Sequence, residues 1–259
     1  MTNQTATPNH EALNPVINDV RPPVGHLSAV WASFFGWTLD AFDFFLVVFC
    51  LTTIGREFGE SDARMALSLT ATLAFRPIGA LLFGILADRY GRRMPLIVNV
   101  LFYSVAGAFT GLVHSYLAFM VLRALFGIGM GGQWGIGASL AMEKVPAKRR
   151  GMLSGLLQQG YAAGSLFAAI CYLLLLRKWG WRPLFFVGCI PALFLVVFIY
   201  QRVKESEVWE RSSGRNWRNL TREFGSHWRL FLYLTIFMMM MLFASHGTQD
   251  MYPTFLQRQ

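Results

Sequence analysis

Several polar side chains with different chemistries lie close together near the end of the sequence, directly after an apolar run at residues 230–241. A hydroxyl, an imidazole, an amide and a carboxylate fall within residues 245–250. Polar groups at membrane depth are costly unless they face a cavity or a partner, which makes them functional candidates. Gly247 and Pro253 weaken the helix here, and interrupted membrane helices often line substrate sites. The candidates in this stretch are Ser245, His246, Thr248, Gln249 and Asp250.

Four charged residues interrupt apolar runs earlier in the chain, namely Asp40, Asp43, Arg76 and Arg123. The two aspartates lie three positions apart, so they share one face of a helix. Counted along their helices, Asp43 and Arg123 lie about eight and about six residues from the same membrane face, roughly 10 Å deep for both. A carboxylate and a guanidinium at one depth are expected to pair.

The expected Asp43–Arg123 pair is a candidate proton site. A helix movement that changes the distance between the two groups would make the proton affinity of the carboxylate depend on conformation, which is what coupling requires. We expect Asp43 to carry the proton, with Asp40 as the second choice. Asp250 is a further titratable candidate, or it fixes one tautomer of His246. The alternatives are a static ion pair at Asp43 and a merely interfacial histidine at position 246.

Arg76 has no acidic residue within one turn of it on its own helix, and the depth argument assigns it no carboxylate. A fixed cation near the centre of a bilayer suits an anionic substrate, and its planar fork matches a carboxylate bidentately. The alternative is an ion pair with Asp40 or Asp43. Gln159, in a later apolar segment, is a candidate to line the same cavity.

These side chains need a membrane scaffold, and the composition predicts one. The 259 residues are 54% hydrophobic and 14% charged, against roughly 25% charged residues in a soluble domain, and the mean hydropathy is +0.42. The pattern predicts an all-α polytopic membrane protein. Segments long enough to cross about 30 Å of hydrocarbon are expected at residues 27–51, 64–87, 95–113, 117–142, 151–176, 183–202 and 229–256.

The net charge of +9 does not indicate nucleic-acid binding, because the basic residues cluster in short loops between apolar segments. The loops after the second, fourth and sixth segments carry most of them, which predicts that these loops and the N-terminus are cytoplasmic. Residues 1–26 are polar and contain four prolines, which predicts a disordered cytoplasmic tail. The expected location is the cell membrane.

Neither an enzyme nor a cofactor-binding protein is predicted. Cys50, Cys171 and Cys189 lie in apolar runs without metal-ligand spacing, so we expect small core residues and no disulfide framework. The polar segments contain no nucleophile–base pair, metal set or phosphate loop. The spacing G-x-G-x-x-G at residues 127–132 falls inside a long apolar segment, where small residues serve helix packing rather than nucleotide binding.

The basic loop after the second segment has a particular composition, with glycines for a tight turn and an aspartate among arginines. This loop resembles the signature loop of the major facilitator superfamily, where it acts in gating. The residues that carry the resemblance are Gly84, Asp88, Arg89, Gly91, Arg92 and Arg93. Further resemblances to that family lie at 123–132, at Pro146 with Arg150 and Gly151, at 180–182 with Phe185, and at 205–206.

The resemblance covers about residues 27–259 and implies the organisation of a twelve-helix transporter. Residues 27–202 would form the N-terminal six-helix bundle, 203–228 a cytoplasmic central linker, and 229–259 the first helix of the second half. We therefore expect an N-terminal fragment of a longer protein that is monomeric when complete, with the lipid bilayer as its surroundings.

The stretch at 245–254 resembles the helix-seven signature of the monocarboxylate permeases in the sialate:proton symporter group. Leu242 stands where that signature has an asparagine, so one hydrogen-bonding group is missing. The resemblance implies proton-coupled symport of lactate or pyruvate, with Arg76 on the carboxylate and His246 and Gln249 on its hydroxyl or keto oxygen. Alternatives are sialate, an aromatic or a dicarboxylic acid as the substrate, or a membrane sensor or remnant that transports nothing.

Overall fold

Six long helices form the body of the protein in the computed structural model, which describes residues 26–212, 225–249 and 252–256. Within those residues, these six are long and apolar enough to cross a membrane. The prediction of an all-α, multi-pass membrane protein is confirmed. The helices are α1 (His26–Phe58), α2 (Asp62–Tyr90), α3 (Arg93–Thr110), α4 (Tyr116–Lys144), α5 (Arg150–Trp179) and α6 (Arg182–Arg202).

Local sequence signals set several of these helix ends. The Ser61 hydroxyl accepts a hydrogen bond from the Arg64 N–H at the start of α2, and Ser115 does the same for Ala118 at the start of α4. Each serine satisfies a backbone donor that has no partner within its helix. After α5, Gly180 has φ +76°, a conformation that glycine adopts without steric cost.

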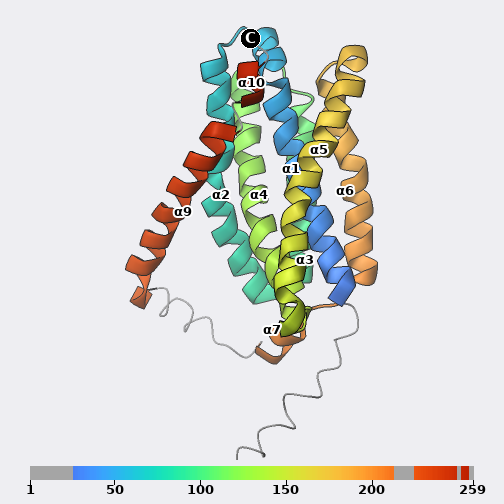
Figure 1. Cartoon of the computed structure of the whole chain (residues 1–259), viewed down its shortest axis with the longest axis vertical. Helices are drawn as coiled ribbons and strands as arrows, with labels where there is room; N and C mark the ends of the chain where they lie inside the picture. The colour runs from blue at the N-terminus through green and yellow to red at the C-terminus, as the bar shows by residue number, and fades with distance from the viewer. Residues whose placement is uncertain (1–25, 213–224, 250–251, 257–259) are drawn as a thin grey trace, which may run out of the picture.

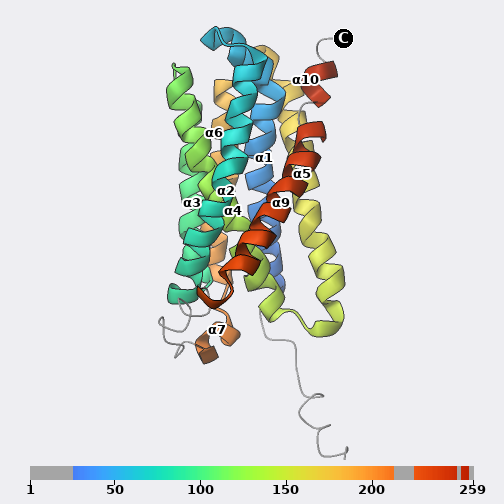
Figure 2. The same cartoon turned by 90° about the vertical axis from the view of Figure 1, so that its left-hand side faces the viewer.

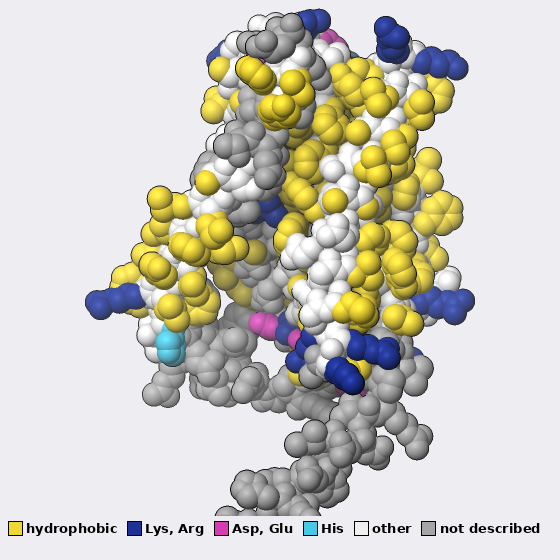
Figure 3. All heavy atoms as spheres, viewed as in Figure 1, with side chains coloured by type: hydrophobic (Ala, Val, Ile, Leu, Met, Phe, Trp, Pro, Cys, Tyr) yellow, Lys and Arg dark blue, Asp and Glu magenta, His cyan; other side chains and the backbone are white. Residues whose placement is uncertain are grey.

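Helix α1 lies inside the bundle and packs against α4, α5 and α6. Its most apolar stretch is 72% buried, against 22% for α2 and α5. The outer faces of the other helices carry exposed leucine, phenylalanine and valine side chains, and Figure 3 shows these side chains along the flank, with basic side chains gathered towards the ends. From this distribution we infer that the outer faces of the other helices face lipid and that α1 lies at the centre of the bundle (Figure 1).

Small residues let α2 and α4 approach closely along the length of their contact. A Cβ atom added at Gly127 would collide with the Thr72 carbonyl oxygen, and one at Gly131 with that of Arg76. The glycines at 127–132 therefore serve helix packing within α4, as the sequence predicted, and they fix the register between Arg76 and the α4 side chains.

The remaining described elements are a 3₁₀ turn (Ala147–Arg149), α7 (Glu207–Ser212), α9 (Trp228–Gln249) and α10 (Tyr252–Leu256). The seventh membrane segment expected over 229–256 stays a prediction: α9 and α10 cover most of it, residues 250–251 lie outside the described part, and Trp228–Met241 forms an apolar stretch within α9. Helix α9 leans away from the other helices at its Trp228 end (Figures 1 and 2), whereas α10 contacts α1.

Candidate functional site

An ion pair inside the bundle joins α1 to α4. The Arg123 guanidinium donates from Nη1 to Asp43 Oδ2 at 3.1 Å and from Nη2 to Thr110 Oγ1 at 2.7 Å. Arg123 is 0% exposed and Asp43 is 7% exposed, so neither charge is screened by water. The pair that the depth argument predicted is present in the structure, while its part in proton coupling stays a prediction.

Aromatic rings enclose the Arg123 guanidinium on its other sides. Its Cζ atom lies 4.6 Å from the Phe126 ring centroid and 5.6 Å from that of Phe185. A cation over an aromatic face gains electrostatic stabilisation, which increases when water is excluded. Arg123 is therefore held by a carboxylate, a hydroxyl and two rings that come from four different helices.

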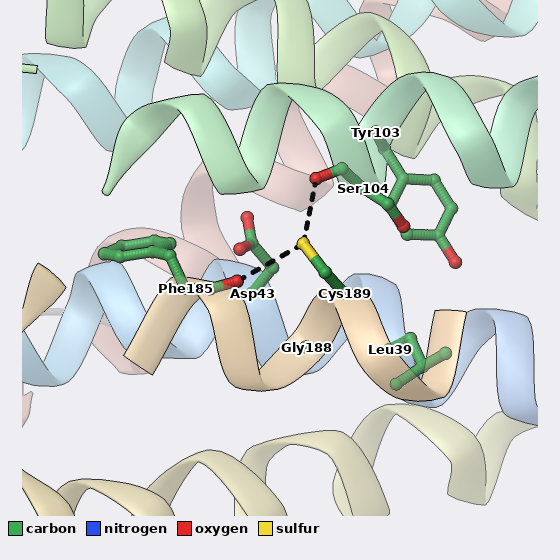
Figure 4. Close-up of a pocket in the computed structure, with 7 residues that line it drawn as sticks. All are labelled: Leu39, Asp43, Tyr103, Ser104, Phe185, Gly188 and Cys189. Carbon is green, nitrogen blue, oxygen red and sulfur yellow. Dashed lines mark hydrogen bonds between the residues drawn. The ribbon is translucent and has the colours of Figure 1, made fainter. Parts of the chain in front are cut away.

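Asp43 also borders a small cavity between α1, α3 and α6 (Figure 4). The Cys189 thiol lies beside it and donates to the Ser104 carbonyl oxygen at 3.5 Å. On the α3 side, a Cβ atom at Gly107 would come within 2.7 Å of Asp43 Oδ1. Helix α3 thus leaves room for the carboxylate by carrying glycine there. The cavity is lined by Leu39, Asp43, Tyr103, Ser104, Phe185, Gly188 and Cys189.

A second cluster lies one helical turn away along α1 and consists of Asp40, Arg76 and Trp134; we call it the Arg76 cluster. The Arg76 guanidinium Cζ lies 5.3 Å from the Trp134 ring centroid, and it interacts electrostatically with Asp40. Asp40 is 0% exposed and Arg76 is 9% exposed. Of the alternatives for Arg76, the ion pair with Asp43 is disfavoured, because Asp43 pairs with Arg123.

Trp134 is the residue of this cluster that the sequence analysis missed. Its ring stacks on Trp37 of α1, with centroids 4.5 Å apart, and meets the edge of Tyr161 of α5 at 6.2 Å. Trp37 is itself held by a hydrogen bond from Nε1 to the Gln133 carbonyl oxygen at 3.3 Å. One rigid aromatic stack therefore supports the Arg76 guanidinium.

Two buried amides next to this stack were also missed, although polar residues in apolar segments were a usable signal. Asn99 of α3 donates from Nδ2 to Gln133 Oε1 of α4 at 3.1 Å, and both residues are 0% exposed. The remaining amide atoms, Asn99 Oδ1 and Gln133 Nε2, have no hydrogen-bond partner among the described residues. Buried polar groups normally have hydrogen-bond partners. This part of the core therefore has one acceptor and one donor more than the hydrogen bonds it forms.

The predicted gating loop forms a charged network at the end of the bundle where α2 meets α3. Arg92 pairs with Asp88 at 2.5 Å and with Glu143 of α4 at 3.4 Å. Gly91 has φ +92°, as a tight turn requires. Arg89 lies over the Tyr90 ring, Arg93 donates to the Tyr200 carbonyl oxygen, and a Cβ atom at Gly84 would meet nothing within 4 Å.

Glu205, which follows α6, caps the start of α3. Its carboxylate accepts from the backbone N–H of Arg92 at 2.7 Å and of Arg93 at 3.1 Å, while Arg92 provides no side-chain cap of its own. A carboxylate at a helix N-terminus satisfies free donors and complements the helix dipole.

Replacing Glu205 with alanine is expected to destabilise the bundle by about 1–2 kcal/mol, because charge-assisted bonds to two helix donors are lost. Thermal unfolding of the complete protein measures this. Glu205→Gln keeps a hydrogen-bond acceptor, so it should lose only the part of the stabilisation that comes from the negative charge. An alanine variant as stable as the parent would contradict the capping role.

The C-terminal candidates are only partly within the described structure. Ser245 is exposed on α9, the side chains of His246, Thr248 and Gln249 fall outside the described part, and Asp250 lies outside it altogether. Gln159 is exposed on α5. A meeting of these residues with Arg76 stays a prediction. Within the described residues, no three His, Cys, Asp or Glu side chains are grouped to hold a metal ion.

Comparison with solved structures supports the fold that contains these clusters. The proton:xylose symporter XylE with bound 6-bromo-6-deoxy-D-glucose is similar over 73% of this chain and 47% of its own, with a TM-score of 0.66 and 24% identity. A D-xylose-proton symporter structure is similar over 88% of this chain and 60% of its own, with a TM-score of 0.68 and 22% identity. At this identity the likeness concerns the fold alone.

Curated relatives match most of this chain but a smaller share of their own. A probable 4-methylmuconolactone transporter of Cupriavidus pinatubonensis is 36% identical over 70% of this chain and 43% of its own length. The sialic acid transporter NanX of Escherichia coli is 31% identical over 73% and 46%. This chain thus spans less than half the length of these relatives. The sequence profile of the Major Facilitator Superfamily matches residues 32–259, and the chain therefore belongs to that superfamily.

Proposed function

We propose that the complete protein is a proton-coupled symporter of a small carboxylic acid, of which lactate and pyruvate are the simplest candidates. The observation that carries this proposal is the Arg76 guanidinium, a cation inside a membrane bundle that is supported on Trp134 at 5.3 Å. An arginine in such a place suits recognition of a carboxylate. Relatives described as transporters of sialic acid, niacin and cis,cis-muconate, all organic acids, support the choice of an acid.

In the proposed mechanism, Arg76 holds the substrate carboxylate while His246 and Gln249 bond its hydroxyl or keto oxygen. Asp43 exchanges its proton as its distance to Arg123 changes, and the two halves of the complete protein rock about the site. The N-terminus and the loop at residues 84–93 lie on the cytoplasmic side of the cell membrane in this proposal, in which the transporter acts as a monomer.

Uptake of labelled lactate into proteoliposomes that contain the complete protein tests the proposal, with and without an inward proton gradient. We expect the gradient to increase uptake. Arg76→Ala should weaken the apparent affinity by about 10- to 150-fold, because a hydrogen-bonded charge contributes about 1.5–3 kcal/mol. Uptake that responds neither to the gradient nor to this substitution would sink the proposal, and Ser245→Ala serves as a milder comparison within the predicted site.

An aromatic or unsaturated acid is the second candidate substrate. The observation in its favour is the set of aromatic rings next to Arg76, since Trp134 contacts both Trp37 and Tyr161, and flat ligands gain from aromatic contacts. Competition of unlabelled nicotinate and of pyruvate against labelled lactate separates the two candidates.

A further inference from the structure

Two buried amides join three helices where α1, α3 and α4 meet. Asn99 of α3 donates from Nδ2 to Gln133 Oε1 of α4 at 3.1 Å, and both side chains are 0% exposed. The Gln133 amide also lies against α1, because a Cβ atom added at Gly36 would collide with Gln133 Nε2. The Gln133 side chain is therefore held between Asn99 on one side and the α1 backbone on the other.

Gln133 also holds Trp37 of α1. The Trp37 Nε1 donates to the Gln133 carbonyl oxygen at 3.3 Å. Gly137, one turn further along α4, leaves room for this indole, since a Cβ atom there would lie 3.1 Å from Trp37 Nε1. The Trp37 ring in turn stacks on Trp134 with 15° between the ring planes. Position 133 thus connects the amide pair to the aromatic stack that supports the Arg76 guanidinium.

A guanidinium with a fixed orientation binds a carboxylate more tightly than a mobile one. Bidentate recognition requires the two groups to share a plane, and ordering a long side chain during binding costs affinity. The Arg76 Cζ lies 5.3 Å from the Trp134 ring centroid, so a rotation of that ring also displaces the guanidinium. Loss of Asn99 would leave the buried Gln133 amide without its donor, which is costly, and a Gln133 side chain that turns to another partner shifts the contact with Trp37 at the same residue.

We propose that Asn99 and Gln133 are positioning residues for Arg76. They act through the Trp37–Trp134 stack, which sets the orientation of the guanidinium and hence its affinity for the substrate carboxylate. Both amides are completely buried, so their effect on the substrate is indirect. This inference rests on the proposed function, since it assumes a carboxylate substrate at Arg76.

Transport kinetics of the complete protein in proteoliposomes test this positioning, with labelled lactate and nicotinate as probes. Asn99→Leu has a similar size but offers no donor to Gln133. We expect KM to rise by about 3- to 10-fold, as for one long side chain that must be ordered during binding, with the maximal rate within about twofold. Exchange of the two amides, Asn99→Gln with Gln133→Asn, keeps a pair of the same total length and should restore KM to within about twofold.

Ser33→Ala is the matched control. Ser33 lies one turn before Trp37 on α1 and donates to the Gly137 carbonyl oxygen at 2.8 Å. This variant removes a buried hydrogen bond between α1 and α4 but no contact of the stack, so it should lower thermal stability and leave KM unchanged. Equal KM values for Asn99→Leu and Ser33→Ala would show that the amides only stabilise the fold, and would overturn the inference.

Trp37→Phe tests the same link where Asn99→Leu does not fold. It keeps a ring on Trp134 but loses the hydrogen bond to the Gln133 carbonyl oxygen. KM should again rise while the maximal rate is kept, and an unchanged KM would overturn the inference.

Circular dichroism separates this inference from the proposed function, because indoles stacked at 4.5 Å couple excitonically whatever the substrate is. Trp134→Phe identifies the exciton band of the wild type. A wild type that transports neither probe refutes the proposed function, whereas loss of the band in folded Asn99→Leu still supports the link from the amides to the stack. A band of wild-type strength in Asn99→Leu overturns that link and, where lactate or nicotinate is taken up, leaves carboxylate transport standing.

Discussion

Replacing Arg123 with methionine is expected to destabilise the complete protein by about 3–5 kcal/mol, because it leaves the Asp43 carboxylate buried without its partner. Methionine keeps much of the side-chain length between Phe126 and Phe185, which lie 4.6 and 5.6 Å from the guanidinium. The loss therefore reports the missing charge and its hydrogen bonds to Asp43 and Thr110 more than lost packing. Thermal unfolding in detergent is the measurement.

The double variant Asp43→Asn with Arg123→Met is the control for this prediction. It removes both charges, and we expect it to recover a large part of the lost stability, because replacing both members of a buried pair is often neutral. It should nevertheless show no proton-driven accumulation. A double variant no more stable than Arg123→Met alone would show that the cost came from packing at position 123.

The second large effect is expected at Gly131, where α4 meets the α2 backbone. In Gly131→Ala, the new methyl group would collide with the Arg76 carbonyl oxygen, and the obstacle is backbone that cannot rotate away. We expect a loss of about 3 kcal/mol, at the upper end of the cost of overpacking a core. Because α2 must move at Arg76 itself, the affinity for the carboxylate should fall as well.

Gly135→Ala is the matched control, one turn further along the same helix. A Cβ atom there meets nothing within 4 Å, so the variant should gain up to about 1 kcal/mol from the higher helix propensity of alanine. The two substitutions are chemically identical and should differ in sign. Equal effects in thermal unfolding would contradict the close α2–α4 contact that the structure contains.

The sequence predicted the features that depend on depth and local pattern. Asp43 and Arg123 were paired by counting residues from helix ends, and that counting works because α-helices rise uniformly through the bilayer. The six bundle helices were found because apolar length is a strong signal. The seventh segment, over 229–256, stays a prediction, because residues 250–251 lie outside the described part.

The features that were missed depend on contacts between distant segments. Trp134 reaches Arg76 only because glycines at 127 and 131 bring α4 against α2 in one register. The Asn99–Gln133 pair likewise needs α3 and α4 to be aligned. A single aromatic or amide residue in an apolar segment has no periodicity that would single it out. The sequence also could not predict that Asp40 has no hydrogen-bond partner among the described residues, because both aspartates share one helix face.

The Glu205 cap has a consequence for the order in which the protein is made. Glu205 lies 113 residues after Arg92, whose N–H it accepts, so the start of α3 has no acceptor in place while the ribosome is still producing α4, α5 and α6. The backbone donors of Arg92 and Arg93 can be capped by Glu205 only when the residues after α6 have left the exit tunnel. The N-terminus of α3 therefore acquires its carboxylate acceptor only after the last residues of the six-helix unit have been synthesised.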